Sequence, residues 1–210
     1  MTVSKSHVVL ITSAALMISA CDTQKAGTNA ADDISTNVAS ADTNAAHSAN
    51  PSNPVESAMS AAPRSIAHDA SIVIANPDGT MKTVREGTNG WTCMPDSPAT
   101  PGPDPMCMDA NAAKWAAAWI GHKPPPANTV GVMYMLEGGT DASNTDPYAT
   151  APTADNDWVK TGPHIMIVGS PDVLKGHPSG AKPETTGPYV MWAGTPYAHL
   201  MVPVADPSAQ

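Results

Sequence analysis

The sequence predicts an α+β fold: a single domain with an antiparallel or mixed sheet of about six short strands, one main helix and long loops rich in proline and glycine. Short strand-like runs lie near both ends of the region after residue 63, and one amphipathic helical repeat lies between them. The chain has 22 Pro, 15 Gly and no Phe. Long loops are therefore expected, and Met, Trp, Leu and Ile supply the bulky core groups.

The first pair of strands is predicted at residues 71–75 and 80–85. Between them, Asn76-Pro77-Asp78-Gly79 has Pro and Gly where a type I turn prefers them, which indicates a hairpin. Residues 87–108 are dense in proline and glycine, and we interpret them as loop.

The main helix is predicted over residues 110–120. Asp109 is a suitable N-cap, Gly121 ends the repeat, and three prolines at 124–126 prevent the helix from resuming. One apolar stripe follows the helical spacing, which favours packing on the sheet and leaves a tryptophan-lined groove as the alternative. Its members are Ala112, Trp115, Ala116 and Trp119.

Three further segments complete the predicted sheet. Residues 129–136 are apolar at nearly every position, as in a strand covered on both faces, and residues 164–168 form another strand. Residues 188–204 are the longest strand-like run after the N-terminal segment, broken only at Gly194-Thr195-Pro196, and they predict a closing hairpin. A short helical turn is expected near residues 171–176.

The net charge of −9 comes from 10 Lys and Arg against 19 Asp and Glu. No basic block occurs anywhere in the chain, which argues against nucleic-acid binding because phosphates require clustered Lys and Arg. No apolar run approaches the roughly 20 residues of a membrane-spanning helix.

The N-terminal segment has the three parts of a secretory signal: a polar start with Lys5, an uncharged stretch from Val8 to Ile18, and Ile18-Ser19-Ala20-Cys21. The last four residues match the lipobox of bacterial lipoproteins, and the chain resembles that class here. The resemblance implies cleavage after residue 20 and a lipid on Cys21. An ordinary signal peptide, in which Cys21 has no role, is the alternative.

The same resemblance sets the expected location at the cell envelope. Asp22 follows the lipid-bearing position, which implies retention on the periplasmic side of the inner membrane, with the outer membrane as the alternative. Residues 21–63 are mostly Ala, Ser, Thr, Asn and Asp, and we expect a disordered tether. The globular domain is then residues 64–210.

Cys93 and Cys107 are the remaining cysteines once Cys21 carries lipid. In an oxidising compartment they are expected to form a disulfide, which stabilises by about 3 kcal/mol on the chain-entropy model. The alternative is metal ligation together with Met94, Met106 and Met108, although the spacing matches no common zinc motif.

Two strands carry the same short pattern, His164-Ile-Met166 and His199-Leu-Met201. Residues i and i+2 of a strand share a face, so each His and its Met point the same way. A three-residue loop in the closing hairpin would place Met191 opposite His199 and Tyr189 opposite Met201.

Imidazole and thioether groups together suit copper, especially Cu(I). This hypothesis has a simple rival, because Met is an adaptable core residue and alternate Met positions on a strand also arise from packing alone. Met133 and Met135 repeat the same spacing on a buried strand. The candidate ligands are His164, Met166, Met191, His199 and Met201.

Two other site hypotheses have weaker support. The polar loop 137–147 offers oxygen ligands for calcium, but it lacks the spacing of an EF-hand and Asx turns explain it equally well. The loop residues concerned are Asp141, Ser143, Asn144 and Asp146. An enzyme would have to use His164, His199, Asp141, Asp146 or Glu137 as acid and base, and no motif of a known hydrolase accompanies them.

The region 87–204 also resembles a family of bacterial secreted proteins through Gly87-Thr-Asn-Gly-Trp-Thr-Cys93, Asp141-Ala-Ser-Asn-Thr-Asp-Pro147 and the closing hairpin. This resemblance implies a single domain and no particular activity. The predicted function is binding, with an envelope protein as the expected partner. Copper binding is the second hypothesis and an envelope hydrolase the third; no cofactor other than copper is expected.

Overall fold

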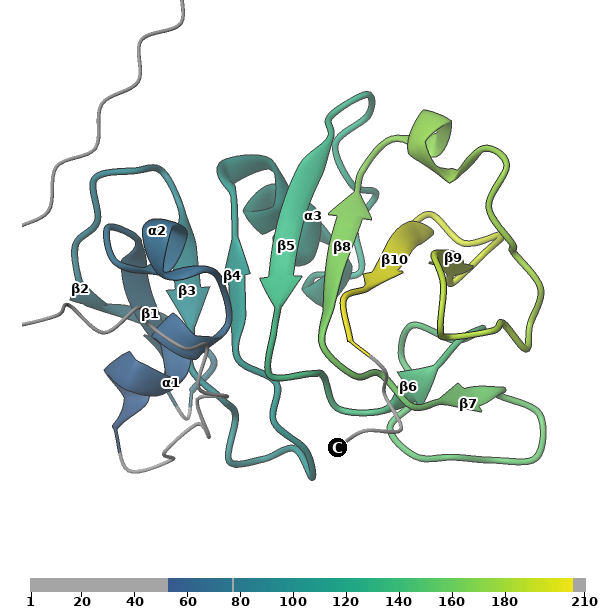
Figure 1. Cartoon of the computed structure of the whole chain (residues 1–210), viewed down its shortest axis with the longest axis horizontal. Helices are drawn as coiled ribbons and strands as arrows, with labels where there is room; N and C mark the ends of the chain where they lie inside the picture. Colours follow the sequence, from purple (N-terminus) through teal and green to yellow (C-terminus); the bar gives the residue numbers. More distant parts are fainter. Residues whose placement is uncertain (1–52, 77, 206–210) are drawn as a thin grey trace, which may run out of the picture. The chain divides into compact units, whose positions relative to one another are not determined.

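The computed structural model describes residues 53–76 and 78–205 (Figure 1). The expected signal peptide, the lipid-bearing Cys21, Asp22 and residues 21–52 of the expected tether lie outside the described residues. In the described part, no helix has the length and apolar character needed to cross a membrane.

The centre of the fold is a mixed sheet of eight strands in the order β2-β1-β3-β4-β5-β8-β10-β9 (Figure 1). β1 and β3 are parallel, and all other neighbours are antiparallel. A second sheet joins β6 to β7. The strands are β1 Ser71–Ala75, β2 Met81–Arg85, β3 Thr92–Met94, β4 Met106–Met108, β5 Gly131–Met135, β6 Ala142–Ser143, β7 Trp158–Val159, β8 His164–Val168, β9 Tyr189–Met191 and β10 His199–Pro203.

The structure confirms the α+β class, but the expected number of strands is too low. β3 and β4 lie inside residues 87–108, which the sequence analysis assigned to loop. Each has only three residues, and β6 and β7 have two. Segments this short carry no detectable periodicity, and their pairing depends on partners far along the chain.

Two short helices cover one face of the sheet. α1 Pro54–Ser60 and α2 Arg64–Ala67 pack with the core cluster that contains Ile72, Cys93 and Cys107. α1 falls within residues 54–63, where the sequence analysis expected tether. Asn53 caps it through Oδ1, which accepts from the backbone N–H of Val55 at 3.1 Å. The helix buries the small residues Ser57 and Ala58 rather than large ones, so composition alone did not reveal it.

The expected disulfide is present in the structure. Cys93 and Cys107 are directly paired residues of β3 and β4, and their sulfur atoms are 2.01 Å apart. Both side chains are fully buried beneath α1 and α2. Because the two sulfurs bind each other, this pair offers no thiolate to a metal.

α3 Ala110–Ile120 covers the opposite face and has the bounds predicted from the sequence. Asp109 holds it against the sheet, because Oδ1 accepts from the N–H of Ala112 at 2.7 Å and Oδ2 accepts from the N–H of Val132 at 3.0 Å. Gly131 makes the close approach feasible, since a Cβ there would lie 2.3 Å from the Ala112 nitrogen. The predicted apolar stripe therefore packs on the sheet. A 3₁₀ turn, η1 Pro171–Leu174, lies within the expected short helix.

Candidate functional site

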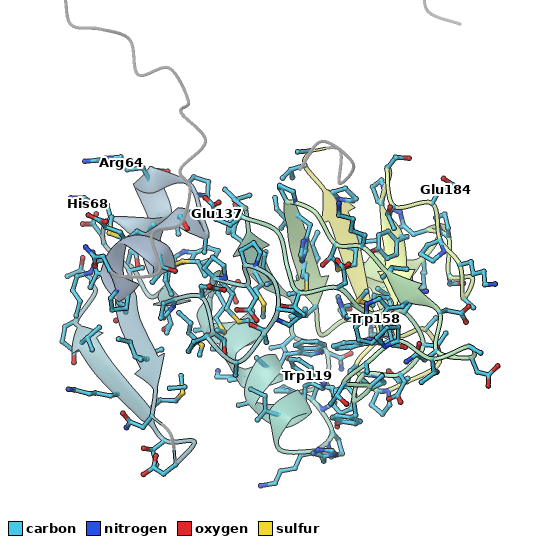
Figure 2. The ribbon with its side chains drawn as sticks, turned by 90° about the horizontal axis from the view of Figure 1, so that it is seen from below. Arg64, His68, Trp119, Glu137, Trp158 and Glu184 are labelled. Carbon is cyan, nitrogen blue, oxygen red and sulfur yellow. A yellow bond between two sulfur atoms is a disulfide. The ribbon has the colours of Figure 1, made fainter. Side chains whose placement is uncertain are left out.

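The sheet face under α3 carries a row of directly paired methionines. Met108 pairs with Met133, Met133 with Met166, and Met166 with Met201. Tyr189 of β9 ends the row opposite Met201. Figure 2 shows side chains filling the space between this face and α3, where Trp119 is labelled. The row places thioether sulfurs from four adjacent strands in one layer.

The closing hairpin has the register expected for the candidate ligands. Met191 lies opposite His199, and Tyr189 lies opposite Met201. Cβ atoms in directly opposed positions are typically about 4.5–5.5 Å apart, so the thioether of Met191 can reach the imidazole of His199. His164, by contrast, pairs with Met135 on one side and Pro203 on the other. The five candidate residues therefore share a face but divide into two groups around the two histidines.

His199 is completely buried, and one of its ring nitrogens has no hydrogen-bond partner among residues 53–76 and 78–205. Nδ1 lies 3.0 Å from the carbonyl oxygen of Tyr197. A carbonyl only accepts, so Nδ1 carries the proton and Nε2 carries the lone pair. Nε2 is buried without a hydrogen-bond partner in the described part of the chain. Leaving such an acceptor unpaired costs about 1–3 kcal/mol.

Two tryptophans enclose the imidazole. The ring centres of Trp115 and Trp192 lie 5.3 Å and 4.8 Å from that of His199, and both meet it edge to face. The two indoles are nearly parallel, with centres 6.2 Å apart. The Nε1–H of Trp115 is also buried without a partner among the described residues. A donor and an acceptor therefore both remain unpaired around His199.

Trp192 is held in a conformation that large residues avoid. Its φ is +56°, in the left-handed region. Its backbone N–H donates to the carbonyl of Asn144 at 2.9 Å, and its indole Nε1–H donates to the carbonyl of Ser143 at 2.9 Å. Backbone strain of this kind persists where surrounding contacts enforce it, and it concentrates at functional sites.

His164 lies beside a small cavity at the other end of the face. Its Nδ1 is 2.6 Å from the carbonyl oxygen of Gly162, which again assigns the lone pair to Nε2. The cavity has a volume of about 10 Å³. It is lined by Lys160, Thr161, Gly162, His164, Thr185, Tyr189, Met201 and Pro203.

Both imidazoles are held in the neutral form. Burial lowers the pKa of His199 to about 4, and the nearby His164 acts in the same direction. Burial also lowers the pKa of His164. A metal binds imidazole only in its neutral form, so neither ligand has to lose a proton first at neutral pH.

The calcium hypothesis finds little support in the polar loop. Oδ1 of Asp141 accepts from the N–H of Thr161 at 3.1 Å, and Oδ1 of Asp146 accepts from the N–H of Tyr148 at 2.9 Å. Ser143 is buried and bonds to backbone groups, and Nδ2 of Asn144 donates to two carbonyls. In the part of the chain that is described, no group of three or more His, Cys, Asp or Glu residues could hold a metal ion. The loop is organised by Asx turns and backbone hydrogen bonds.

The sequence does not predict that two tryptophans surround His199. It places Trp115 in the apolar stripe of the helix and Trp192 in the closing hairpin. Their meeting depends on how α3 packs against the sheet. The left-handed backbone at Trp192 carries no signal in its residue type, since such positions favour Gly or Asn.

Comparison of the chain with protein-family models, curated proteins and solved structures found no match.

Proposed function

We propose that this domain binds Cu(I) at an inner site formed by Nε2 of His199 and the sulfurs of Met191 and Met201, and that a lipid on Cys21 holds the domain at the cell envelope. The unpaired, buried Nε2 of His199 is the observation that carries the metal assignment. Packing accounts for methionines in a core without Phe. It does not account for a buried imidazole lone pair that accepts no hydrogen bond from any described residue, since an apolar residue of similar size avoids that cost.

The chemistry of the surrounding groups favours Cu(I) over other metals. Imidazole and thioether are soft, neutral ligands, and Cu(I) prefers them, whereas calcium and magnesium require oxygen. A neutral ligand set leaves the charge of the ion uncompensated, so a monovalent cation costs less to bury than Zn²⁺ or Cu²⁺. The faces of Trp115 and Trp192 add cation–π attraction for a cation placed near them.

A metal ion replaces the envelope protein partner that the sequence predicts as the first candidate ligand of the domain. The buried position of His199 favours this order, because an ion can reach Nε2 inside the core and a protein partner bound at the surface cannot. An enzyme would need a proton carrier that titrates near neutral pH. Burial moves the pKa of His199 and that of His164 away from that range.

Titration of the full-length chain in detergent with Cu(I), under reductant and against a competing chelator, tests the inner site. His199→Leu and Met191→Leu remove a ligand and keep an apolar side chain in place. We expect each to weaken Cu(I) binding at least tenfold. Met108→Leu, at the far end of the methionine row, is the matched control and should bind as the wild type does.

Unchanged Cu(I) affinity in both His199→Leu and Met191→Leu would overturn the assignment. A buried water between Nε2 of His199 and Nε1–H of Trp115 would then satisfy both atoms. Parallel titrations with Zn²⁺ and Cu²⁺ test the preference for a monovalent ion. Either ion binding more tightly than Cu(I) contradicts the argument from neutral ligands.

The lipid anchor rests on Ile18-Ser19-Ala20-Cys21 and has its own test. Cys21→Ser is expected to abolish incorporation of labelled palmitate and to remove the mature chain from the membrane fraction, because several acyl chains supply about 0.8 kcal/mol per buried CH₂. The double variant Cys93→Ser/Cys107→Ser should still be labelled. Labelling that survives Cys21→Ser would contradict the lipid assignment.

A further inference from the structure

The geometry points to a second Cu(I) site, an outer site in the cavity beside His164, from which the ion passes to His199 through Met201. The identity of the ion rests on the function proposed above, but the outer site stands on separate residues. Its supporting features are an ion-sized cavity, a histidine whose lone pair is assigned to Nε2 by the contact of Nδ1 with Gly162, and a methionine shared with the inner site.

The cavity is the right size for a single ion. Its volume of about 10 Å³ is close to that of one water-sized probe. His164, Tyr189 and Met201 form its buried wall, whereas Lys160 is exposed and Thr185 and Pro203 are half-buried. The cavity therefore extends from the surface toward the methionine row. His199 is fully buried and does not line it.

The imidazole of His164 is held in position before any ion arrives. Its Nδ1–H donates to the carbonyl of Gly162, so the ring presents Nε2 as an acceptor. Gly139 makes room for the ring, because a Cβ there would lie 3.2 Å from Cε1 of His164 and 2.9 Å from Oγ1 of Thr161. A histidine ligand fixed by a backbone carbonyl through its other nitrogen is a common arrangement in metal sites.

Two methionines lie close to this imidazole. Met201 lines the same cavity as His164. Met135 is the directly paired residue on β5, and its Cε is 3.5 Å from the position that a Cβ on Gly139 would take. The outer site therefore has the same ligand chemistry as the inner one. Tyr189 contributes a neutral phenol, since burial raises the pKa of its hydroxyl.

Met201 connects the two sites. It lies two residues after His199 on β10, so both side chains project from the same face. It also pairs directly with Met166 of β8. An ion bound by His164 and Met201 moves inward by ligand exchange, in which a bond to Nε2 of His199 forms and the bond to Nε2 of His164 breaks. The copper remains Cu(I), and no electron or proton is transferred.

Among the described residues that line the cavity, Lys160 carries the one charge that opposes a cation. Lys160 is exposed, so water screens its charge and its side chain can turn outward. Lys160→Gln is therefore expected to bind Cu(I) at the outer site two- to threefold more tightly than the wild type. Weaker binding in this variant would indicate that the cavity takes an anion or a water instead.

Stopped-flow mixing of the full-length chain with Cu(I) separates the two sites, because an ion at His199 quenches the fluorescence of Trp115 and Trp192. The wild type should bind two equivalents of Cu(I). His164→Leu should bind one, and its tryptophan fluorescence should be quenched at least tenfold more slowly. Met135→Leu is the second variant and should lower only the affinity for the outer equivalent. His199→Leu should retain one equivalent that quenches weakly.

The possible failures are distinguishable. The outer site is overturned if the wild type binds one equivalent of Cu(I) and His164→Leu is quenched at the wild-type rate. That result would still support the inner site. Two equivalents with unchanged quenching in His199→Leu overturn the inner site. No binding at all overturns both.

Discussion

The metal-free domain is expected to lose roughly 3 kcal/mol of its free energy of unfolding between pH 6.5 and pH 4 through His199 alone. Burial lowers the pKa of His199 from 6.5 to about 4 in the folded state. In this range the unfolded chain binds a proton at His199 and the folded chain does not. Stability is therefore fully present above pH 6.5 and is lost as the pH falls toward 4. His164 acts in the same direction.

Urea unfolding at pH 7, 5.5 and 4.5 in the presence of a chelator measures this loss. His199→Leu should flatten the dependence of the urea midpoint on pH. A steep loss that persists in His199→Leu would show that another group is responsible. Asp104 serves as a check, because burial raises its pKa and Asp96 adds to the effect. A carboxyl group with a raised pKa binds its proton more readily in the folded state, so it adds stability as the pH falls. This opposes the effect of His199, and Asp104→Asn should therefore make the loss of stability toward low pH steeper.

Removing the disulfide is expected to cost about 3 kcal/mol, since it closes a loop of roughly 15 residues. The double variant Cys93→Ala/Cys107→Ala should also lose packing, because both side chains are fully buried among the alanines of α1 and α2. Denaturant unfolding of the oxidised wild type and the variant gives the difference. Equal midpoints would mean that the bond adds no stability.

The burial of Cys93 and Cys107 also predicts slow reduction. A reductant reaches the sulfurs only after the segment from α1 to β4 opens, so the reduction rate should follow the rate of that opening. Thiol labelling after addition of dithiothreitol measures it, with denatured protein as the control. Immediate labelling of the native chain would contradict the buried position of the bond.

Local signals in the sequence predict the first and last residues of some helices and strands. Asp109 and Gly121 mark the ends of α3, and the apolar run 164–168 matches β8. The register expected from a loop at Gly194-Thr195-Pro196, with Met191 opposite His199, is observed, but the connection is longer than three residues because β9 ends at Met191 and β10 begins at His199. In each of these cases neighbouring residues alone determine the outcome.

Long-range contacts determine the rest. β3 and β4 are strands because they pair with β1, with each other and with β5. α1 is ordered because Ala58 packs in the core cluster with Ile72, Cys93 and Cys107. The His-x-Met spacing predicts a shared face. It does not predict that His164 borders a cavity, or that Trp115 and Trp192 surround His199.

The strand order also has a consequence for how the protein folds. Each strand of the large sheet pairs with strands near it in strand order, and the longest connection between paired strands is residues 169–198, between β8 and β10. Closing short loops has a small entropic cost, so the sheet can extend from the β2 edge as successive strands are added. β9 and β10 join last in such a sequence. His199 lies on β10, and the chain therefore gains its inner copper ligands only when the final hairpin docks.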